Sequence, residues 1–227
     1  MKHLVLSLSV LATVVFFGAC KKSSSSPSNS ASVMFVNDCT PQTTLNLDAS
    51  VNNTNVSSGT NLAYGSSSGY QYVTAGTGAV INFKLTGLNT LFATTTQSLT
   101  VNDKYSVFVG GIFTTPIVVF AADDLTAPSS GMAKIRFVNL CADGLNTDCY
   151  VGINKVDSNI SYGNCSAFIE VPATTAAVQM NDHTVAAEFA SITSQQLTAG
   201  KIYTILLTGT VSGSGSAALK LTSISNN

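Results

Sequence analysis

An internal repeat covers most of this chain and limits the folds that are open to it. The stretch ASVMFVNDC at 31–39 returns as AKIRFVNLC at 133–141, an offset of 102 residues. Two later stretches return at an offset of 98: LAYGSSSGYQYVTAG at 62–76 as ISYGNCSAFIEVPAT at 160–174, and TQSLTVNDKYSVFVGG at 96–111 as SQQLTAGKIYTILLTG at 194–209. The matching order and nearly constant spacing predict that one unit of about 100 residues has been duplicated.

Alternating apolar residues predict that each unit consists of short β-strands. In the first copy, Val33 and Phe35 alternate with positions that we expect to be more exposed, and 45–51 alternates strictly; Ile135 and Phe137, and then 149–153, repeat this in the second copy. Further strands are expected near 70–73, 80–85, 105–109 and 117–121, with turns at 52–53, 57–59, 76–78, 102–103 and 212–215.

The number of strands predicts the fold class. Six or seven short strands in about 100 residues are typical of an immunoglobulin-like antiparallel β-sandwich. The segment LTAPSSG at 125–131 interrupts the strand pattern between the copies. We therefore expect an all-β protein with two tandem sandwich domains, at residues 32–131 and 132–227.

The N-terminal segment has the pattern of an exported lipoprotein. The apolar run from Leu4 to Ala19 is short for a bilayer span and follows a basic start, which predicts a signal peptide at 1–19. Phe17-Gly18-Ala19-Cys20 resembles the bacterial lipobox, in which the cysteine carries the lipid. We expect Cys20 to be acylated and the serine-rich stretch 20–31 to be a flexible linker. The alternative is an ordinary anchor helix with an incidental cysteine.

The residues after Cys20 indicate a destination. Lysine rather than aspartate follows the cysteine, and no acidic cluster comes after it. This arrangement resembles that of lipoproteins held at the outer membrane and facing the periplasm. We expect the protein to bind the membrane through its N-terminal lipid.

Composition excludes several function classes. The chain has 10 Lys and Arg residues against 11 Asp and Glu residues, so it lacks the basic face that a nucleic-acid partner requires. Beyond the signal segment it contains one histidine, His183, and no tryptophan. A multi-histidine metal site within one chain is therefore excluded, and no glycine-rich phosphate loop precedes a helix. We expect neither a metal nor a cofactor.

Motifs shared by the two copies resemble one bacterial family. Each copy has an FVN strand, a YG turn before Y/F-x-x-V-x-A, and an LT-x-x-x-x-Y strand, and DDLTAPSSGMAKIRFVN at 123–139 joins the copies. These features are similar to domain-of-unknown-function family 4397, found in bacterial envelope lipoproteins. The family's Asp/Pro-rich turn after the first strand is only partly kept, as DCTPQ and LCADG. The resemblance covers about 32–227 and implies a β-sandwich at the cell envelope, with no activity attached.

Few ionisable residues have a pattern that suggests chemistry. Asp143, Asn146 and Asp148 share one loop, and Asp123-Asp124 ends the first copy, but neither group has the alternating ligands of a calcium loop. Turn formation is the favoured interpretation. His183 is the sole base for a nucleophile–base pair, and it lies in MNDHTVAA, where we expect a solvated hairpin turn.

Tyr64, Tyr70 and Tyr72 are the candidate ligand-binding residues. Tyrosine rings can stack on a glycan, and Tyr70 and Tyr72 share one face of a strand. The lack of tryptophan weakens this interpretation. Tyr64 has a counterpart in Tyr162, which favours a structural role for this pair, such as packing at the edge of a sandwich.

Four cysteines lie beyond Cys20: Cys39, Cys141, Cys149 and Cys165. An exported protein can form disulfides, and four cysteines allow three pairings. Cys149 and Cys165 lack counterparts in the first copy, so a bond between them is the first candidate and Cys141–Cys149 is its main competitor. Buried free thiols are the alternative.

These features predict a non-enzymatic envelope module that is tethered by a lipid and presents loops to a protein or glycan partner. The alternative is an envelope hydrolase or carbohydrate-processing enzyme. Such an enzyme would need a cleft with paired carboxylates, or a nucleophile beside His183.

Overall fold

A computed structural model describes residues 27–40 and 46–227 of the chain. The predicted signal peptide at 1–19, the lipidation site Cys20 and most of the predicted linker lie outside the described residues. Within the described part, no helix has both the length and the apolar character that crossing a membrane requires.

The described residues form eight strands in each copy. The first copy contains β1 (Ser30–Asn37), β2 (Leu47–Val51), β3 (Thr54–Asn55), the short 3-10 helix η1 (Ser57–Gly59), β4 (Ser66–Thr74), β5 (Gly76–Leu85), β6 (Leu91–Leu99), β7 (Lys104–Ile112) and β8 (Thr115–Ala122). The second copy contains β9 (Met132–Asn139), β10 (Thr147–Val151), β11 (Asn154–Ile160), β12 (Ile169–Pro172), β13 (Thr175–Asp182), β14 (Glu188–Gln196), β15 (Ile202–Thr208), the short 3-10 helix η2 (Gly215–Ala217) and β16 (Lys220–Ser225).

Each copy is a sandwich of two four-stranded sheets. The sheet orders are β4-β1-β7-β8 and β3-β2-β5-β6 in the first copy, and β12-β9-β15-β16 and β11-β10-β13-β14 in the second. Corresponding strands occupy corresponding positions in the two copies. The structure therefore confirms the prediction of an all-β protein built from a duplicated sandwich.

One strand pair in each copy departs from antiparallel order. β1 runs parallel to β7, and β9 runs parallel to β15, in the middle of their sheets. The two strands of each pair are far apart in sequence, so no hairpin fixes their relative direction and alternation of residues cannot reveal it. The immunoglobulin-like arrangement stays a prediction.

The first sandwich begins slightly before the predicted boundary at residue 32. β1 starts at Ser30, which pairs with Thr74 of β4, and Ala31 is fully buried in the core. In the second sandwich the first strand, β9, starts at Met132.

Each copy has its own hydrophobic core between its two sheets. Phe35, Ile81 and Phe83 are fully buried in the first core, and Ile135 and Phe137 are fully buried in the second. Because apolar burial dominates folding stability, each half has its own source of stability.

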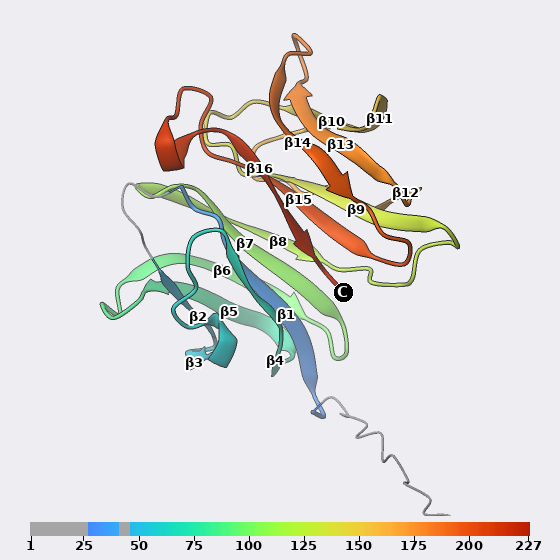
Figure 1. The fold of residues 1–227 in the computed structure, drawn as a ribbon. Coiled ribbons are helices and arrows are strands. Elements are labelled where there is room, and N and C mark those ends of the chain that lie inside the picture. Colours follow the sequence, from blue (N-terminus) through green and yellow to red (C-terminus); the bar gives the residue numbers. More distant parts are fainter. Residues whose placement is uncertain (1–26, 41–45) are drawn as a thin grey trace, which may run out of the picture.

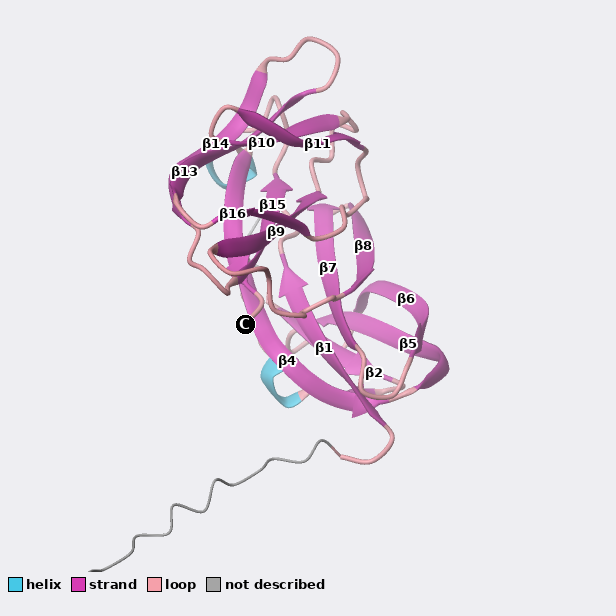
Figure 2. Ribbon diagram, turned by 90° about the vertical axis from the view of Figure 1, so that its right-hand side faces the viewer, coloured by secondary structure: helices cyan, strands magenta, loops and turns pink. Residues whose placement is uncertain are grey.

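A third apolar cluster joins the two copies. It lies between the outer face of the β4-β1-β7-β8 sheet and that of the β12-β9-β15-β16 sheet, so the four sheets stack as four layers (Figure 1; Figure 2 gives the view from the side). Its fully or nearly fully buried members are Met34, Val36, Phe108, Val119, Val138, Leu140 and Leu206.

This contact corrects one expectation about β1. Val33 and Phe35 face the core of their own sandwich, as alternation predicts. Met34 and Val36, expected to be more exposed, are only 1% and 0% exposed because they face the second copy. A continuous apolar run is typical of a strand that is covered on both faces.

Candidate functional site

The motif residues shared by the copies fasten loops to strands. In each copy the asparagine of FVN donates its amide to a backbone carbonyl, and the glycine of the YG turn donates its N–H to that asparagine's carbonyl. The tyrosine of LT-x-x-x-x-Y accepts the N–H of the motif's threonine. The pairs are Asn37–Leu62 and Asn139–Ile160, Gly65–Asn37 and Gly163–Asn139, and Thr100–Tyr105 and Thr198–Tyr203. The repeated motifs therefore have structural roles.

A buried polar network links the two sandwiches. Asp123 follows β8, and its side chain is 0% exposed. One of its oxygens accepts hydrogen bonds from Tyr70 Oη at 2.5 Å and Ser106 Oγ at 2.6 Å, and the other lies 2.5 Å from Nη1 of Arg136 on β9. Burial, followed by the negative charge of Asp123, raises the pKa of the Tyr70 phenol well above its usual range. Tyr70 therefore serves as a hydrogen-bond donor inside the protein.

The arginine of this network is enclosed by both copies. Arg136 is 1% exposed, and its guanidinium lies 4.4 Å from the ring centroid of Phe168 and 5.4 Å from that of Phe108. Its Nε donates to Thr204 Oγ1 at 2.9 Å. Buried charges need such pairing because desolvation is costly, and the planar guanidinium also stacks on aromatic rings.

The second aspartate of the junction also pairs with β9. Asp124 Oδ2 accepts a hydrogen bond from Lys134 Nζ at 2.9 Å, and its Oδ1 accepts from the backbone N–H and hydroxyl of Thr126. Hydrogen bonds from Thr126 and then Lys134 hold the pKa of Asp124 below its usual range. Asp124 therefore forms the turn that the sequence favours, while Asp123 forms a buried ion pair that the sequence does not reveal.

The duplicated tyrosines contact opposite copies. Tyr64 of the first copy lies under Lys220 of the second, with Nζ 4.3 Å from its ring centroid. Tyr162 of the second copy reaches the first, where its hydroxyl lies 2.6 Å from the position a Cβ would take at Gly111. A side chain at Gly111 would therefore collide with Tyr162. Tyr64 and Tyr162 thus both contribute to the contact between the two sandwiches, rather than to packing at the edge of one sandwich.

His183 belongs to a polar cluster at the start of β10. Its Nδ1 lies 2.8 Å from Asp148 Oδ1, and its ring is 41% exposed in the turn after β13. Asp148 also accepts from Lys155 Nζ at 2.6 Å and from the N–H of Asn159 at 3.1 Å. Burial favours the neutral acid, but the hydrogen bonds from Lys155, His183 and Asn159 together lower the pKa of Asp148. The turn position was predicted, whereas the pairing with Asp148 was not.

The other residues of the predicted acidic loop are also used in local structure. Asp143 Oδ2 accepts the N–H of Val211 at 2.8 Å, and Asn146 Nδ2 donates to Asn159 Oδ1 at 2.6 Å. Across residues 27–40 and 46–227, no three His, Cys, Asp or Glu side chains are grouped so that they could hold a metal ion.

Two grooves occupy equivalent positions in the two sandwiches. Groove 1, of about 360 Å³, lies between the β2–β3 hairpin with η1 and strand β4. Groove 2, of about 350 Å³, lies between the β10–β11 hairpin and β12. Groove 1 is lined by Val51, Asn52, Thr54, Asn55, Val56, Ser57, Gln71, Tyr72, Val73 and Thr74. Groove 2 is lined by Val151, Gly152, Ile153, Asn154, Val156, Glu170, Val171, Pro172, Thr174 and Ala176.

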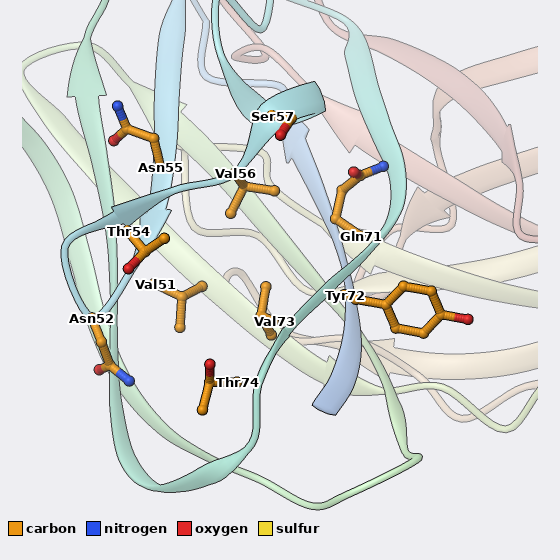
Figure 3. A pocket seen from close by; sticks show the side chains of 10 residues that line it. All are labelled: Val51, Asn52, Thr54, Asn55, Val56, Ser57, Gln71, Tyr72, Val73 and Thr74. Atoms are coloured by element: carbon orange, nitrogen blue, oxygen red, sulfur yellow. The ribbon is translucent and has the colours of Figure 1, made fainter. Parts of the chain in front are cut away.

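Both grooves lie on the side of their sandwich where the edges of the two sheets are not packed together. On the opposite side of each copy, β6 packs near β8 and β14 packs near β16, which brings the sheet edges together. On the groove side, the short strand β3 leaves the core valines Val51, Val56 and Val73 near the surface (Figure 3). Apolar floors with a few polar groups at the rim are typical of binding sites.

The three candidate tyrosines do not share one surface. Tyr64 contacts Lys220 at the start of β16, and Tyr70 donates a hydrogen bond to Asp123 in the buried network. Tyr72 is 54% exposed on groove 1, but Figure 3 shows its ring pointing away from the space between the valines. The predicted glycan-stacking set is therefore separated into two structural residues and one groove residue.

The four described cysteines are free thiols, so the predicted disulfide is absent from this structure. Cys149 lies in the second core, between the two sheets of that copy. Cys165 packs against the cluster between the copies, on the outer face of the β12-β9-β15-β16 sheet. Cys141 is in the second core and Cys39 in the first. Burial, followed by nearby Asp38, raises the pKa of the Cys39 thiol to about 12. Such thiols behave as small apolar side chains.

Comparisons with known proteins identify the repeated unit. Residues 31–146 and 139–227 each match the family described as Domain of unknown function (DUF4397). A search of the curated proteins gave no match. Among solved structures, a leucine-rich repeat protein from Bacteroides thetaiotaomicron VPI-5482 is 13% identical, with 78% of this chain and 26% of that protein covered at a TM-score of 0.20. The chain thus spans about a quarter of that protein, and so low a score carries no argument about fold.

Proposed function

For this chain, which belongs to the DUF4397 family and carries two copies of its domain, we propose the role of a non-enzymatic binding module. In this proposal Cys20 carries a lipid that anchors the protein in the bacterial cell envelope, at the outer membrane. The tandem sandwich then presents its surface to an envelope protein or glycan.

The observation that supports this proposal most strongly is the pair of equivalent grooves on a tightly joined tandem fold. Most of the acidic candidates from the sequence form ion pairs inside the structure. Asp123 pairs with Arg136, Asp124 with Lys134, and Asp148 with Lys155 and His183. The grooves instead combine exposed rims with apolar floors. A rigid scaffold that holds such surfaces in fixed positions suits recognition, because little ordering is required on binding.

A binding screen tests the proposal. The full-length protein, purified in detergent, is applied to a glycan array and to detergent-solubilised envelope proteins, with the Tyr72→Glu variant in parallel. We expect saturable binding to one class of partner that Tyr72→Glu weakens. Binding that occurs only through the detergent-bound anchor, or no binding to either class, would contradict the proposal.

An enzyme is the second candidate, and one observation favours it: Asp148 orients His183, as a carboxylate orients a catalytic base. Among the described residues, the only hydrogen-bond partner shown for the ring is Asp148, and no hydroxyl or thiol is paired with it. His183→Ala separates the candidates. A binding module keeps its partner affinity in this variant, whereas a hydrolase built on this pair loses its turnover of any substrate found.

A further inference from the structure

Strand β4 is a sheet edge whose pairing with β1 is interrupted by a register shift at Ser68-Gly69 and is regular over Tyr70–Thr74. Within the described part of the chain it ends the order β4-β1-β7-β8 and pairs with β1 alone. Its nine residues, SSSGYQYVT, include neither a charged residue nor a proline. An edge strand presents a row of backbone donors and acceptors, and proteins usually protect such edges with charge, proline, short length or a bulge. The regular part of β4, beside groove 1, has none of these.

The equivalent edge of the second copy combines charge, proline and short length. β12 is only four residues long, contains Glu170 and ends at Pro172. At the repeat offset of 98, Glu170 and Pro172 stand where the first copy has Tyr72 and Thr74. Because the two copies share one strand order, the difference concerns this edge itself rather than the fold.

Groove 1 places a pocket for side chains directly beside this edge. Val51, Val56 and Val73 are 4%, 7% and 8% exposed, and their side chains gather between the β2–β3 hairpin and β4 (Figure 3). None of the ten lining residues carries a charge, whereas groove 2 contains Glu170. The site therefore suits an uncharged occupant. The outward direction of the Tyr72 ring removes the aromatic platform on which a sugar would stack.

We propose that β4 and groove 1 bind an extended, uncharged peptide segment of a partner protein as an added strand. The peptide backbone pairs with the free edge of β4, and alternate side chains of small apolar type enter the groove and contact the three valines. Strand addition of this kind derives affinity from main-chain hydrogen bonds and specificity from pockets for alternate side chains. The inference rests on the proposed binding role and names its partner class.

The test uses full-length protein in detergent and a library of eight-residue peptides in which random uncharged residues alternate with threonine. We expect a peptide to bind and to slow amide hydrogen exchange across Ser66–Thr74. Two derivatives of that peptide, methylated on one or the other alternate set of backbone amides, probe the geometry. One derivative should bind at least tenfold more weakly while the other binds normally, because only one set of N–H groups faces β4.

Variants taken from the second copy provide the matched test. Tyr72→Glu alone, and Tyr72→Glu with Thr74→Pro, should weaken peptide binding at least tenfold. Val185→Glu adds the same charge at a turn residue that is 70% exposed in the second copy, and should leave binding unchanged. Amide hydrogen exchange of the unliganded variants shows whether each keeps the fold. If the proline of the double variant disturbs the strand, Tyr72→Glu alone, at an exposed side chain, still tests the inference.

Several results would overturn the inference. The first is that no peptide of the library binds. The second is that both methylated derivatives bind equally weakly, and the third is that Tyr72→Glu binds the peptide as tightly as wild type. A neutral glycan that competes at this edge would also overturn it, while leaving the wider binding role in place. Failure of peptides, glycans and envelope proteins alike would count against the proposed function itself.

Discussion

At the scale of single residues, the contact between the copies contains an acid that is not fully paired. Asp38, at the end of β1, is 1% exposed, and its Oδ2 accepts a hydrogen bond from Thr222 of the second copy at 3.2 Å. Among the described residues its Oδ1 has no hydrogen-bond partner. Burial raises the pKa of Asp38 from 3.8 to about 6, against the opposing effect of Lys220. The repeat places Leu140 at the equivalent position, so an apolar residue there is compatible with this type of fold.

This raised pKa predicts how stability depends on pH. A group with a higher pKa in the folded state binds its proton more tightly there than in the unfolded state. Protonated Asp38 therefore contributes to the free energy of unfolding fully below about pH 4, and this contribution is lost as pH rises through 6. A rise of this size corresponds to about 2–3 kcal/mol at most. Asp38→Asn should remove this contribution to the pH dependence. Denaturant unfolding at pH 4 and pH 7.5 measures it, and identical losses in wild type and variant would contradict the assignment.

At the scale of strands, β1 and β9 show what alternation can and cannot predict. The residues that face each sandwich core were predictable, because Val33, Phe35 and their repeats follow a period of two. The opposite faces were not, since nothing in one strand indicates that a second sheet covers it. Arg136 is the extreme case: a charged residue predicts exposure, but its partner Asp123 neutralises it inside the contact.

Arg136→Met tests this strand face, since Met34 occupies the equivalent position in the first copy. The variant leaves Asp123 buried without its cation, so we expect a loss of about 3–5 kcal/mol in the free energy of unfolding. Asp123→Asn combined with Arg136→Met should recover much of that loss, because no lone charge remains. The two variants are compared by denaturant unfolding at pH 7. A double variant that is as unstable as the single one would show that the ion pair is not the cause.

At the scale of the whole molecule, the duplication was readable from the sequence but the joining of the copies was not. Each half has a hydrophobic core of its own. Met34, Phe108 and Leu206, however, are buried because the other half covers them. The predicted tyrosine platform failed for the same reason: Tyr64 and Tyr70 are used in contacts with the second copy, which the repeat pattern cannot show. Groove 1 also escaped prediction, because it depends on the short length of β3.

This arrangement predicts the behaviour of a nicked protein. A protease site inserted between Ser129 and Ser130, both exposed, cuts the junction without entering a strand. Each half should keep its β-structure, and the halves should stay together through the shared cluster and the Asp123–Arg136 pair. Size-exclusion chromatography with circular dichroism measures both properties. Halves that separate in buffer, or that lose their β-signal while associated, would contradict the account.

Labelled-palmitate incorporation with cell fractionation tests whether a lipid on Cys20 anchors the protein, as we propose. Cys20→Ser removes the thiol that accepts the lipid in our proposal. Lys21 and Lys22 cannot replace the lipid, because each surface charge contributes only about 1 kcal/mol at an anionic leaflet. Wild type should incorporate label and partition with membranes, whereas Cys20→Ser should be unlabelled and remain as precursor or appear as a soluble form. Unlabelled wild type, or a variant labelled as strongly as wild type, would contradict the claim.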